Sequence, residues 1–199
     1  MPNWTENHVH IKFGKEKDVE DFRAFIRSDD LEFDFNKIVP MPPELEIEAS
    51  SSVDDAIILL TNDTESMKNM LSWGWVASDG IKTIEGVRKA LQERTSEKAM
   101  ELGKQALENI KKYGCKNWYE WHNKYWGTKW NACDLVLGPH KTEKELRYRF
   151  NTAWCHPEPI FLALSAKFPT ARIKVLYIDE DYDGDHTVSY LGGELVEEF

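Results

Sequence analysis

The sequence is poor in the features that would place it among membrane proteins or disulfide-rich secreted proteins. No apolar run approaches the roughly 20 residues that a membrane-spanning helix needs, so we expect no membrane partner. The chain has three cysteines among 199 residues, an odd and unclustered set that favours free thiols in a reducing compartment. Residues 1–13 contain no apolar signal-peptide core, which makes a cytoplasmic location the expectation.

Motifs of well-understood chemistry are missing as well. The chain contains no glycine-rich phosphate loop, no serine triad, no paired helix carboxylates and no HExxH sequence. Cys133 and His140 lie seven residues apart, which is not the closely spaced ligand pairing of a zinc ribbon. We therefore expect no catalytic residue and no cofactor, and the sequence favours a binding role over an enzymatic one.

Basic residues are scarce, and the acidic ones are unevenly distributed. The chain has 25 Lys and Arg against 35 Asp and Glu, a net charge of −10, which argues against a generic binder of phosphate backbones. Residues 29–55 hold nine acids and one base, and residues 179–199 hold eight acids and neither Lys nor Arg. The remainder carries a net charge of +6, so the protein is bipolar.

Hydrophobic periodicity predicts an alternation of strands and helices. Period-two patterns predict strands at residues 3–13, 130–137, 145–154, 171–179 and 186–191. Helical spacing predicts helices at residues 16–28, 53–60, 64–71, 83–112, 117–126 and 157–168. The pattern leaves open whether residues 83–112 form one helix or two, because Gly86 and Gly103 both weaken it.

The order of these elements predicts an α+β fold. Strand, helix, strand, strand, helix, strand is the split βαβ arrangement, that is, a ferredoxin-like antiparallel sheet with helices on one face. Residues 50–113 would be a helical insertion, and residues 186–191 an extra C-terminal strand. We expect residues 1–199 to form a single domain, given the length of the chain.

Four sequence motifs occur in order along the chain. The first opens the chain as MPNW and is followed by Asn7; the second, at residues 33–43, is FDFNKIVPMPP. The third, at residues 118–132, is WYEWHNKYWGTKWNA; the fourth, at residues 150–159, is FNTAWCHPEP. Together they resemble the YubB-type ferredoxin-like domain family of small proteins from phages, plasmids and integrated phage-like elements.

The resemblance implies a ferredoxin-like fold and a mobile-element setting in a bacterial host cell, with no established activity. Two positions depart from the family pattern. Thr5 stands where members commonly have cysteine after the opening Asn-Trp, so a thiol role cannot hold there. Cys155-His156-Pro157 stands where members commonly have Ser-Pro-Pro.

Tryptophans gather between residues 118 and 130. Aromatic residues at helical spacing usually form packing, and that interpretation is favoured here. The alternative is a groove whose indole faces stack a base, a sugar or a cation. The residues of that ligand site would be Asn3, Trp4, Trp118, Trp121, Trp126, Thr128, Lys129, Trp130, Asn131 and Trp154.

Basic residues would line the face of the sheet that the helices leave open. They are His8, His10, Lys12, Arg147, Arg149, Arg172 and Lys174. RNA-recognition domains use such a sheet face, although Tyr148 and Phe150 would point to the buried side here. Solvated charge is the commoner explanation of such a pattern.

Residues 179–185 resemble part of a calcium-binding loop. Asp179, Asp181, Asp183 and Asp185 match its positions one, three, five and seven. Tyr190 stands at position twelve, where a bidentate glutamate is needed, and the flanks are predicted strands. An acidic hairpin turn is therefore the favoured interpretation.

The hypothesis that follows is a non-enzymatic accessory protein that acts by binding a protein partner. Its acidic surfaces would engage a basic host or defence protein, by imitating the charge of nucleic acid. The alternative is binding, or turnover, of a nucleotide-like small molecule or of RNA by the aromatic pocket or the basic sheet face.

Overall fold

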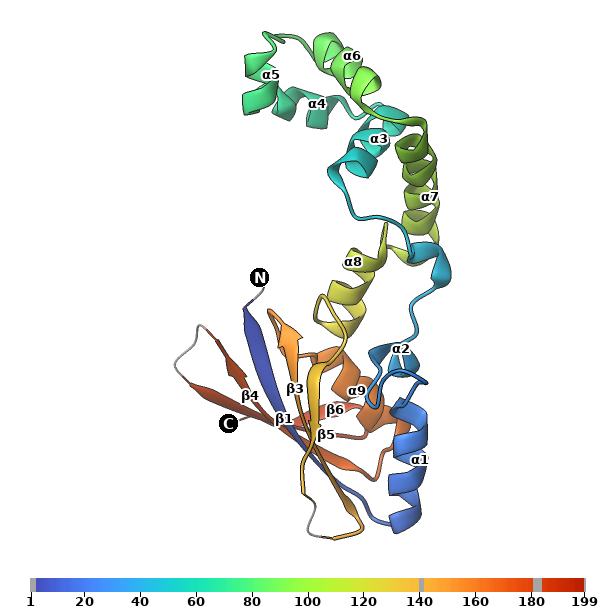
Figure 1. Cartoon of the computed structure of the whole chain (residues 1–199), viewed down its shortest axis with the longest axis vertical. Helices are drawn as coiled ribbons and strands as arrows, with labels where there is room; N and C mark the ends of the chain where they lie inside the picture. The colour runs from blue at the N-terminus through green and yellow to red at the C-terminus, as the bar shows by residue number, and fades with distance from the viewer. Residues whose placement is uncertain (1–2, 140–141, 181–183, 199) are drawn as a thin grey trace. The chain divides into compact units, whose positions relative to one another are not determined.

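The computed structural model describes residues 3–139, 142–180 and 184–198, and their contacts divide the chain into two units. The first unit comprises residues 1–41 and 122–199, and the second comprises residues 42–121. The residues predicted to be inserted, 50–113, fall inside the second unit. Each unit has a structure of its own (Figure 1).

The first unit is built on a six-stranded antiparallel sheet. Its strands are β1 (Trp4–Lys12), β2 (Cys133–Leu137), β3 (Glu145–Ala153), β4 (Arg172–Asp179), β5 (Asp185–Leu191) and β6 (Glu194–Glu198). Their order in the sheet is β2-β3-β1-β4-β5-β6, and every neighbouring pair is antiparallel. The first four strands thus have the order of a split βαβ fold, and the predicted α+β, ferredoxin-like class is confirmed.

The C-terminal extension contains the predicted extra strand, β5, and a further strand, β6, that the sequence did not predict. Gly192 and Gly193 have φ values of 65° and 89°, which a two-residue hairpin turn with positive φ at both positions requires. The turn returns the chain as β6, which pairs with β5. The sequence of β6 is rich in glutamate and lacks the alternation that predicts a strand.

The helices of the first unit lie on one face of its sheet. They are α1 (Glu16–Ile26), α2 (Phe35–Ile38), the π-helical segment η2 (His122–Trp126) and α9 (Glu158–Lys167). Phe22 of α1 and Phe161 of α9 belong to the same buried cluster as Val9, Phe150 and Val175 of the strands. Along β1 the odd-numbered residues 5–11 are buried and the even-numbered ones are not, as alternation in a half-covered strand requires.

The second unit is helical. Its elements are η1 (Pro43–Leu45), α3 (Ser51–Thr61), α4 (Thr64–Met70), α5 (Gly74–Ser78), α6 (Ile84–Arg94), α7 (Glu97–Tyr113) and α8 (Trp118–Trp121). Met67, Met70, Val76, Val87 and Leu91 form its small apolar core. Among the described residues, no helix is both long and apolar enough to cross a membrane.

The sequence left open whether residues 83–112 form one helix or two. The structure has two helices there, α6 and α7. The break falls at Thr95, and Ser96 begins α7 as a side-chain cap that accepts from the Ala99 amide. Gly103 lies inside α7 without ending it. A Cβ at Gly103 would lie 2.8 Å from the Cβ of Ala56, so this glycine allows close packing of α3 on α7.

Candidate functional site

The face of the sheet that carries no helix of the first unit is lined with polar and charged side chains. On β1 they alternate with the buried residues, and β3 and β4 continue the same face. The set comprises Glu6, His8, His10, Lys12, Glu145, Arg147, Arg149, Asn151, Arg172 and Lys174. We call these residues the open face.

Strand register arranges the cations of the open face in rows across the sheet. His10 lies opposite Arg147 of β3 on one side and Lys174 of β4 on the other. His8 lies opposite Arg149. Successive residues on one face of a strand are about 7 Å apart, so the rows stand side by side along the strands.

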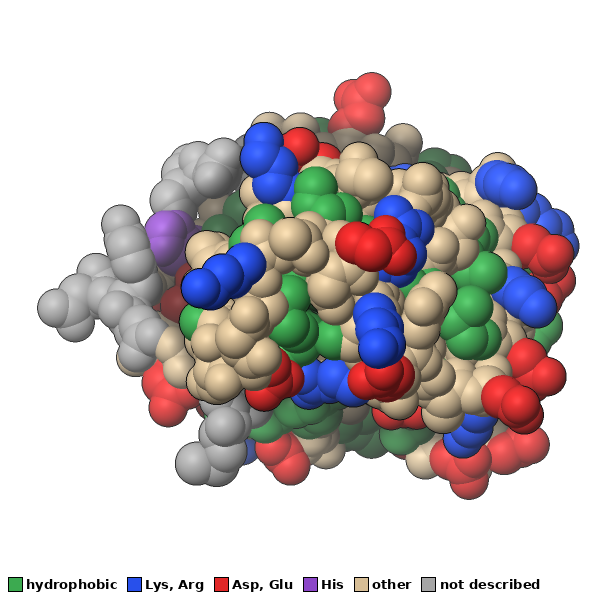
Figure 2. Space-filling model, turned by 90° about the horizontal axis from the view of Figure 1, so that it is seen from above, with side chains coloured by type: hydrophobic (Ala, Val, Ile, Leu, Met, Phe, Trp, Pro, Cys, Tyr) green, Lys and Arg blue, Asp and Glu red, His purple; other side chains and the backbone are tan. Residues whose placement is uncertain are grey.

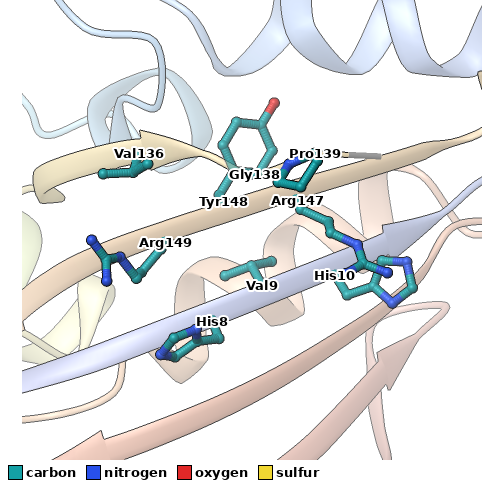
Figure 3. Close-up of a pocket in the computed structure, with 9 residues that line it drawn as sticks. All are labelled: His8, Val9, His10, Val136, Gly138, Pro139, Arg147, Tyr148 and Arg149. Carbon is teal, nitrogen blue, oxygen red and sulfur yellow. The ribbon is translucent and has the colours of Figure 1, made fainter. Parts of the chain in front are cut away.

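A depression of about 320 Å³ lies over β1, β3 and the end of β2 (Figure 3). It is lined by His8, Val9, His10, Val136, Gly138, Pro139, Arg147, Tyr148 and Arg149. Figure 3 shows His8 and Arg149 toward one end of it, and His10 and Arg147 toward the other. Gly138 donates its amide to the Arg147 carbonyl at 2.9 Å, and a Cβ at Gly138 would lie 2.9 Å from the Cβ of Arg147.

Several cations of the open face have no partner within the part of the chain that is described. Lys12, Arg149 and Lys174 are exposed and make no hydrogen bond or ion pair with another described residue. Arg147 Nε is buried and, within the same ranges, finds no hydrogen-bond acceptor. Because an unneutralised guanidinium strongly attracts anionic oxygens, this surface is suited to an anionic ligand.

The histidines of the open face lie beside its carboxylates. His8 Nε2 contacts Glu6 Oε1 at 2.5 Å, and His10 Nε2 is 3.4 Å from Glu145 Oε2. The pKa of His10 is lowered below 6.5, mainly by burial. The charge of Arg147 also lowers this pKa, whereas Glu145 raises it. His10 is therefore neutral at pH 7, and the positive charge of this surface comes from its arginines and lysines.

Trp126, predicted as part of an aromatic ligand site, is a core residue. It is buried, with ring centroids 5.7 Å from Phe35 in an edge-to-face contact and 3.7 Å from His122 in a stacked one. Its indole Nε1 donates to the Val39 carbonyl at 2.9 Å. These contacts are those of packing.

Thr128 and Asn131 hold the third sequence motif to the second and fourth. The Thr128 hydroxyl is buried and donates to the Ala153 carbonyl at 2.8 Å. Asn131 Nδ2 donates to Asp34 Oδ1 at 2.8 Å, and Asn131 Oδ1 accepts from the Phe35 amide at 2.9 Å. Both side chains thus make their hydrogen bonds to other residues of the fold.

The remaining residues of the predicted aromatic site fall in two places. Trp4 and Trp130 pair with ring centroids 6.0 Å apart, and Lys129 Nζ lies 4.7 Å from the Trp130 centroid. Trp154 follows β3, and its amide donates to the Asn3 carbonyl at 2.9 Å. Trp118 and Trp121 belong to α8 of the second unit.

The predicted calcium loop is only partly described. Asp181 and Asp183 lie outside the described residues. Asp179 accepts from the Thr5 hydroxyl at 2.6 Å, and Asp185 is the exposed first residue of β5. Within the described ranges no group of three or more His, Cys, Asp or Glu is placed to hold a metal ion.

The acidic residues predicted to form a binding surface at positions 29–55 are partly neutralised. Glu44 pairs with Lys112 at 3.0 Å, and Asp54 pairs with Lys116 at 2.7 Å. Figure 2 shows a face of the molecule on which acidic and basic side chains are interspersed. Arg27 also contacts Glu32 at 3.2 Å, so at least three of the nine acids in residues 29–55 have a basic partner.

Comparisons with known proteins agree with the sheet topology. A family model described as a ferredoxin-like domain in Api92-like protein matches residues 125–198. The first unit is ferredoxin-like. The crystal structure of a protein api92 from Yersinia pseudotuberculosis is similar with a TM-score of 0.50 and 11% sequence identity, over 100% of this chain and 98% of that one. No curated protein matches.

At this identity the likeness to api92 speaks for the fold alone. The residues that the family model matches include β2 to β6 and α9. Arg147, Arg149, Arg172 and Lys174 lie within the matched residues, whereas the histidines of β1 precede them.

Sequence reasoning missed a buried polar network on the other side of the same strands. His156 Nδ1 lies 2.8 Å from Asn7 Oδ1, and His156 Nε2 lies 2.8 Å from the Tyr190 hydroxyl. Its ring stacks on that of Tyr177 with centroids 4.5 Å apart. Burial lowers the pKa of His156 to about 3.

The partners of Asn7 fix the tautomer of His156. Asn7 Nδ2 donates to Thr152 Oγ1 at 2.9 Å and to the Thr5 carbonyl at 3.0 Å, so Asn7 Oδ1 is the acceptor. His156 Nδ1 therefore carries the proton and donates, while Nε2 accepts from Tyr190. The available signal was Asn7, a polar residue at a position where alternation predicts burial.

Proposed function

We propose that the open face binds single-stranded nucleic acid. The observation that carries the proposal is the row of Arg147, His10 and Lys174 across three strands, next to Arg149 and the depression of about 320 Å³. Phosphate oxygens are the acceptors that unneutralised guanidinium groups favour. A cationic surface that extends across several strands suits an extended chain of phosphates.

The net charge of −10 does not oppose this proposal, because the acids lie mainly elsewhere. The unpartnered cations are on β1, β3 and β4, whereas β5 and β6 contribute Asp185 and Glu194. A footprint over the four strands of the ferredoxin-like core would avoid those acids. Ferredoxin-like sheet faces also bind single-stranded RNA in RNA-recognition domains, which is support by analogy.

The test is fluorescence anisotropy with a labelled oligouridylate of about ten nucleotides, at about 50 and about 200 mM salt. We expect saturable binding that weakens with salt. In the double variant Arg147→Ala, Arg149→Ala, two phosphate contacts are lost. We expect at least a tenfold loss of affinity at the lower salt, and a salt slope smaller by about 1.4.

The matched control removes two cations from the second unit. Lys98 and Lys104 are exposed on α7 and make no ion pair with another described residue. The variant Lys98→Ala, Lys104→Ala has the same net charge as the arginine double variant and should bind like the wild type. Equal losses in the two variants, or no saturable binding at the lower salt, would reject the proposal.

A protein partner held through acidic residues is the second candidate. β6 is an edge strand of the described sheet; Glu194 is exposed, and Leu195 and Val196 are each 41% exposed. An edge strand offers unpaired backbone groups to an added strand, and its acids would favour a basic segment. Salt-sensitive capture of a basic bacterial protein that is lost in Leu195→Pro would support this candidate.

We infer the biological setting from the four sequence motifs. Their resemblance to YubB-type proteins supports an accessory protein of a phage, plasmid or other mobile element that acts in the cytoplasm of a bacterial host. A nucleic-acid ligand and a host-protein partner are both compatible with that setting. Purification of the tagged chain from bacterial cells carrying the element, with and without ribonuclease, would separate the two.

A further inference from the structure

Three chain segments meet at the sheet end where β1 begins. β3 and β4 are both antiparallel to β1, so their carboxyl ends flank its first residues. The Trp154 amide donates to the Asn3 carbonyl at 2.9 Å, and the Glu180 amide donates to the Trp4 carbonyl at 3.0 Å. We call Trp4, Trp130, Trp154 and Glu180 the aromatic end of the sheet.

Trp154 has a backbone conformation that is unfavourable for a bulky residue. Its φ is 71°, in the left-handed region that glycine and asparagine tolerate and other residues avoid. Packing of the Trp154 side chain does not explain this conformation, because the side chain is 54% exposed and stacks on no other described ring. Strain at an exposed aromatic residue points to a binding role.

The other two rings of this end pair with each other, and one of them already has a cation over its face. Trp4 and Trp130 lie 6.0 Å apart with their planes at 42°, and the Lys129 ammonium lies 4.7 Å from the Trp130 centroid. An ammonium or guanidinium group at such a distance from an indole face is attracted by the ring quadrupole. Indoles at this end can therefore hold positive charge.

One carboxylate, that of Glu180, belongs to the aromatic end. Glu180 Oε2 accepts from the Trp4 amide at 2.9 Å, and Asp179 Oδ1 accepts from the Thr5 hydroxyl at 2.6 Å. Glu180 lies next to Trp4, whereas Asp179 lies beside Thr5, whose side chain is on the covered face. A cation at the rings would gain from the Glu180 carboxylate and from the indole faces.

We propose that the aromatic end binds an arginine or lysine side chain of a basic peptide segment in a partner protein. Trp154 and Trp4 would supply ring faces, and Glu180 would supply the countercharge. The site is separate from the cationic rows of the open face, since Trp4 and His8 are four residues apart on β1, about 13 Å along the strand. The inference therefore stands whether or not the open face binds nucleic acid.

The test is isothermal titration of the protein with a short glycine-arginine peptide. The matched control peptide carries citrulline in place of arginine, which keeps the shape and most hydrogen bonds but removes the charge. We expect saturable binding of the arginine peptide alone, weakened by salt. Trp154→Gly, which suits a φ of 71°, should keep the fold and weaken peptide binding at least fivefold.

Two further variants keep the test decisive. Trp73→Ala removes another exposed tryptophan, 48% exposed at the start of α5, and should leave peptide affinity unchanged. Glu180→Gln should weaken binding about threefold, and it tests the site even if Trp154→Gly fails to fold. Equal binding of the citrulline peptide would overturn the proposal. So would a Trp154→Gly variant that weakens oligouridylate binding and leaves peptide binding intact, because the rings would then stack bases.

Discussion

The two faces of the sheet use the same strands in opposite ways. On the helix-covered face the polar side chains are few, and the buried Asn7 is hydrogen-bonded to the half-buried His156. On the open face Arg149 and Lys174 have no hydrogen-bond partner among the described residues. Polar groups in the core thus hold the strands together, whereas those on the open face are available to a ligand.

Histidine shows how the environment decides the role of a residue. His156 is stacked and bonded at both ring nitrogens, and burial lowers its pKa to about 3. Burial also lowers the pKa of His10, but this residue lies beside Arg147 and Glu145 at the depression. The first histidine is a neutral part of the core, and the second is a neutral donor or acceptor at a surface.

The largest expected contrast between the faces comes from neighbouring residues of β3. Phe150 is 1% exposed and packs against Phe33 and Phe35, so Phe150→Ala should lower the free energy of unfolding by about 3–5 kcal/mol. Arg149→Ala should change it by less than about 0.5 kcal/mol. Urea denaturation followed by tryptophan fluorescence measures both, and equal losses would contradict the assignment of the two faces.

Asn7→Ala tests the polar network of the covered face. The change removes the acceptor of the His156 Nδ1 proton and a donor to Thr152, so a buried N–H loses its partner. We expect a loss of about 2–3 kcal/mol in the free energy of unfolding. Glu6→Ala, the adjacent residue on the open face, is the control and should cost less than about 1 kcal/mol.

The alternation of the sequence was enough to predict the fold class and the two faces. His8, His10 and Arg149 fall on one side, and Val9 and Phe150 on the other, because a strand half covered by helices separates its residues with period two. The order of strands and helices then predicted the ferredoxin-like topology. These features depend on local pattern, which a sequence carries directly.

Features that depend on long-range contacts were not predictable in the same way. His156 meets Asn7 and Tyr190, which are 149 and 34 residues away, and no local pattern pairs them. Trp126 lies in an aromatic stripe, and the stripe did not reveal that its partner is Phe35. The strand β6 was not predicted because its glutamates interrupt the alternation typical of a strand. It forms because the turn at Gly192 and Gly193 brings it back to pair with β5.

Acid should weaken the covered face through His156. Its pKa is about 3 in the folded protein and near 6.5 when unfolded, so between these values the unfolded chain binds the extra proton. Stability is retained above pH 6.5 and is lost as the pH falls toward 3, by at most about 1.4 kcal/mol per pH unit from this group.

The measurement compares wild type with His156→Gln in urea at about pH 7 and about pH 5. Glutamine keeps a donor and an acceptor but does not titrate. The variant should be less stable at the higher pH, and it should lose about 1–2 kcal/mol less than the wild type on acidification. Parallel losses in the two proteins would show that other groups cause the acid sensitivity.

The smallest effect on stability is expected at Lys174 of the open face. Lys174 is exposed and unpaired among the described residues, so Lys174→Ala should shift the free energy of unfolding by less than about 0.5 kcal/mol. If the open face binds nucleic acid, the same variant should reduce the salt slope of oligouridylate binding by about 0.7, the contribution of one phosphate contact to a single strand. An unchanged slope would remove β4 from the proposed interface and confine the ligand to β1 and β3, since Lys174 lies opposite His10 in the central row.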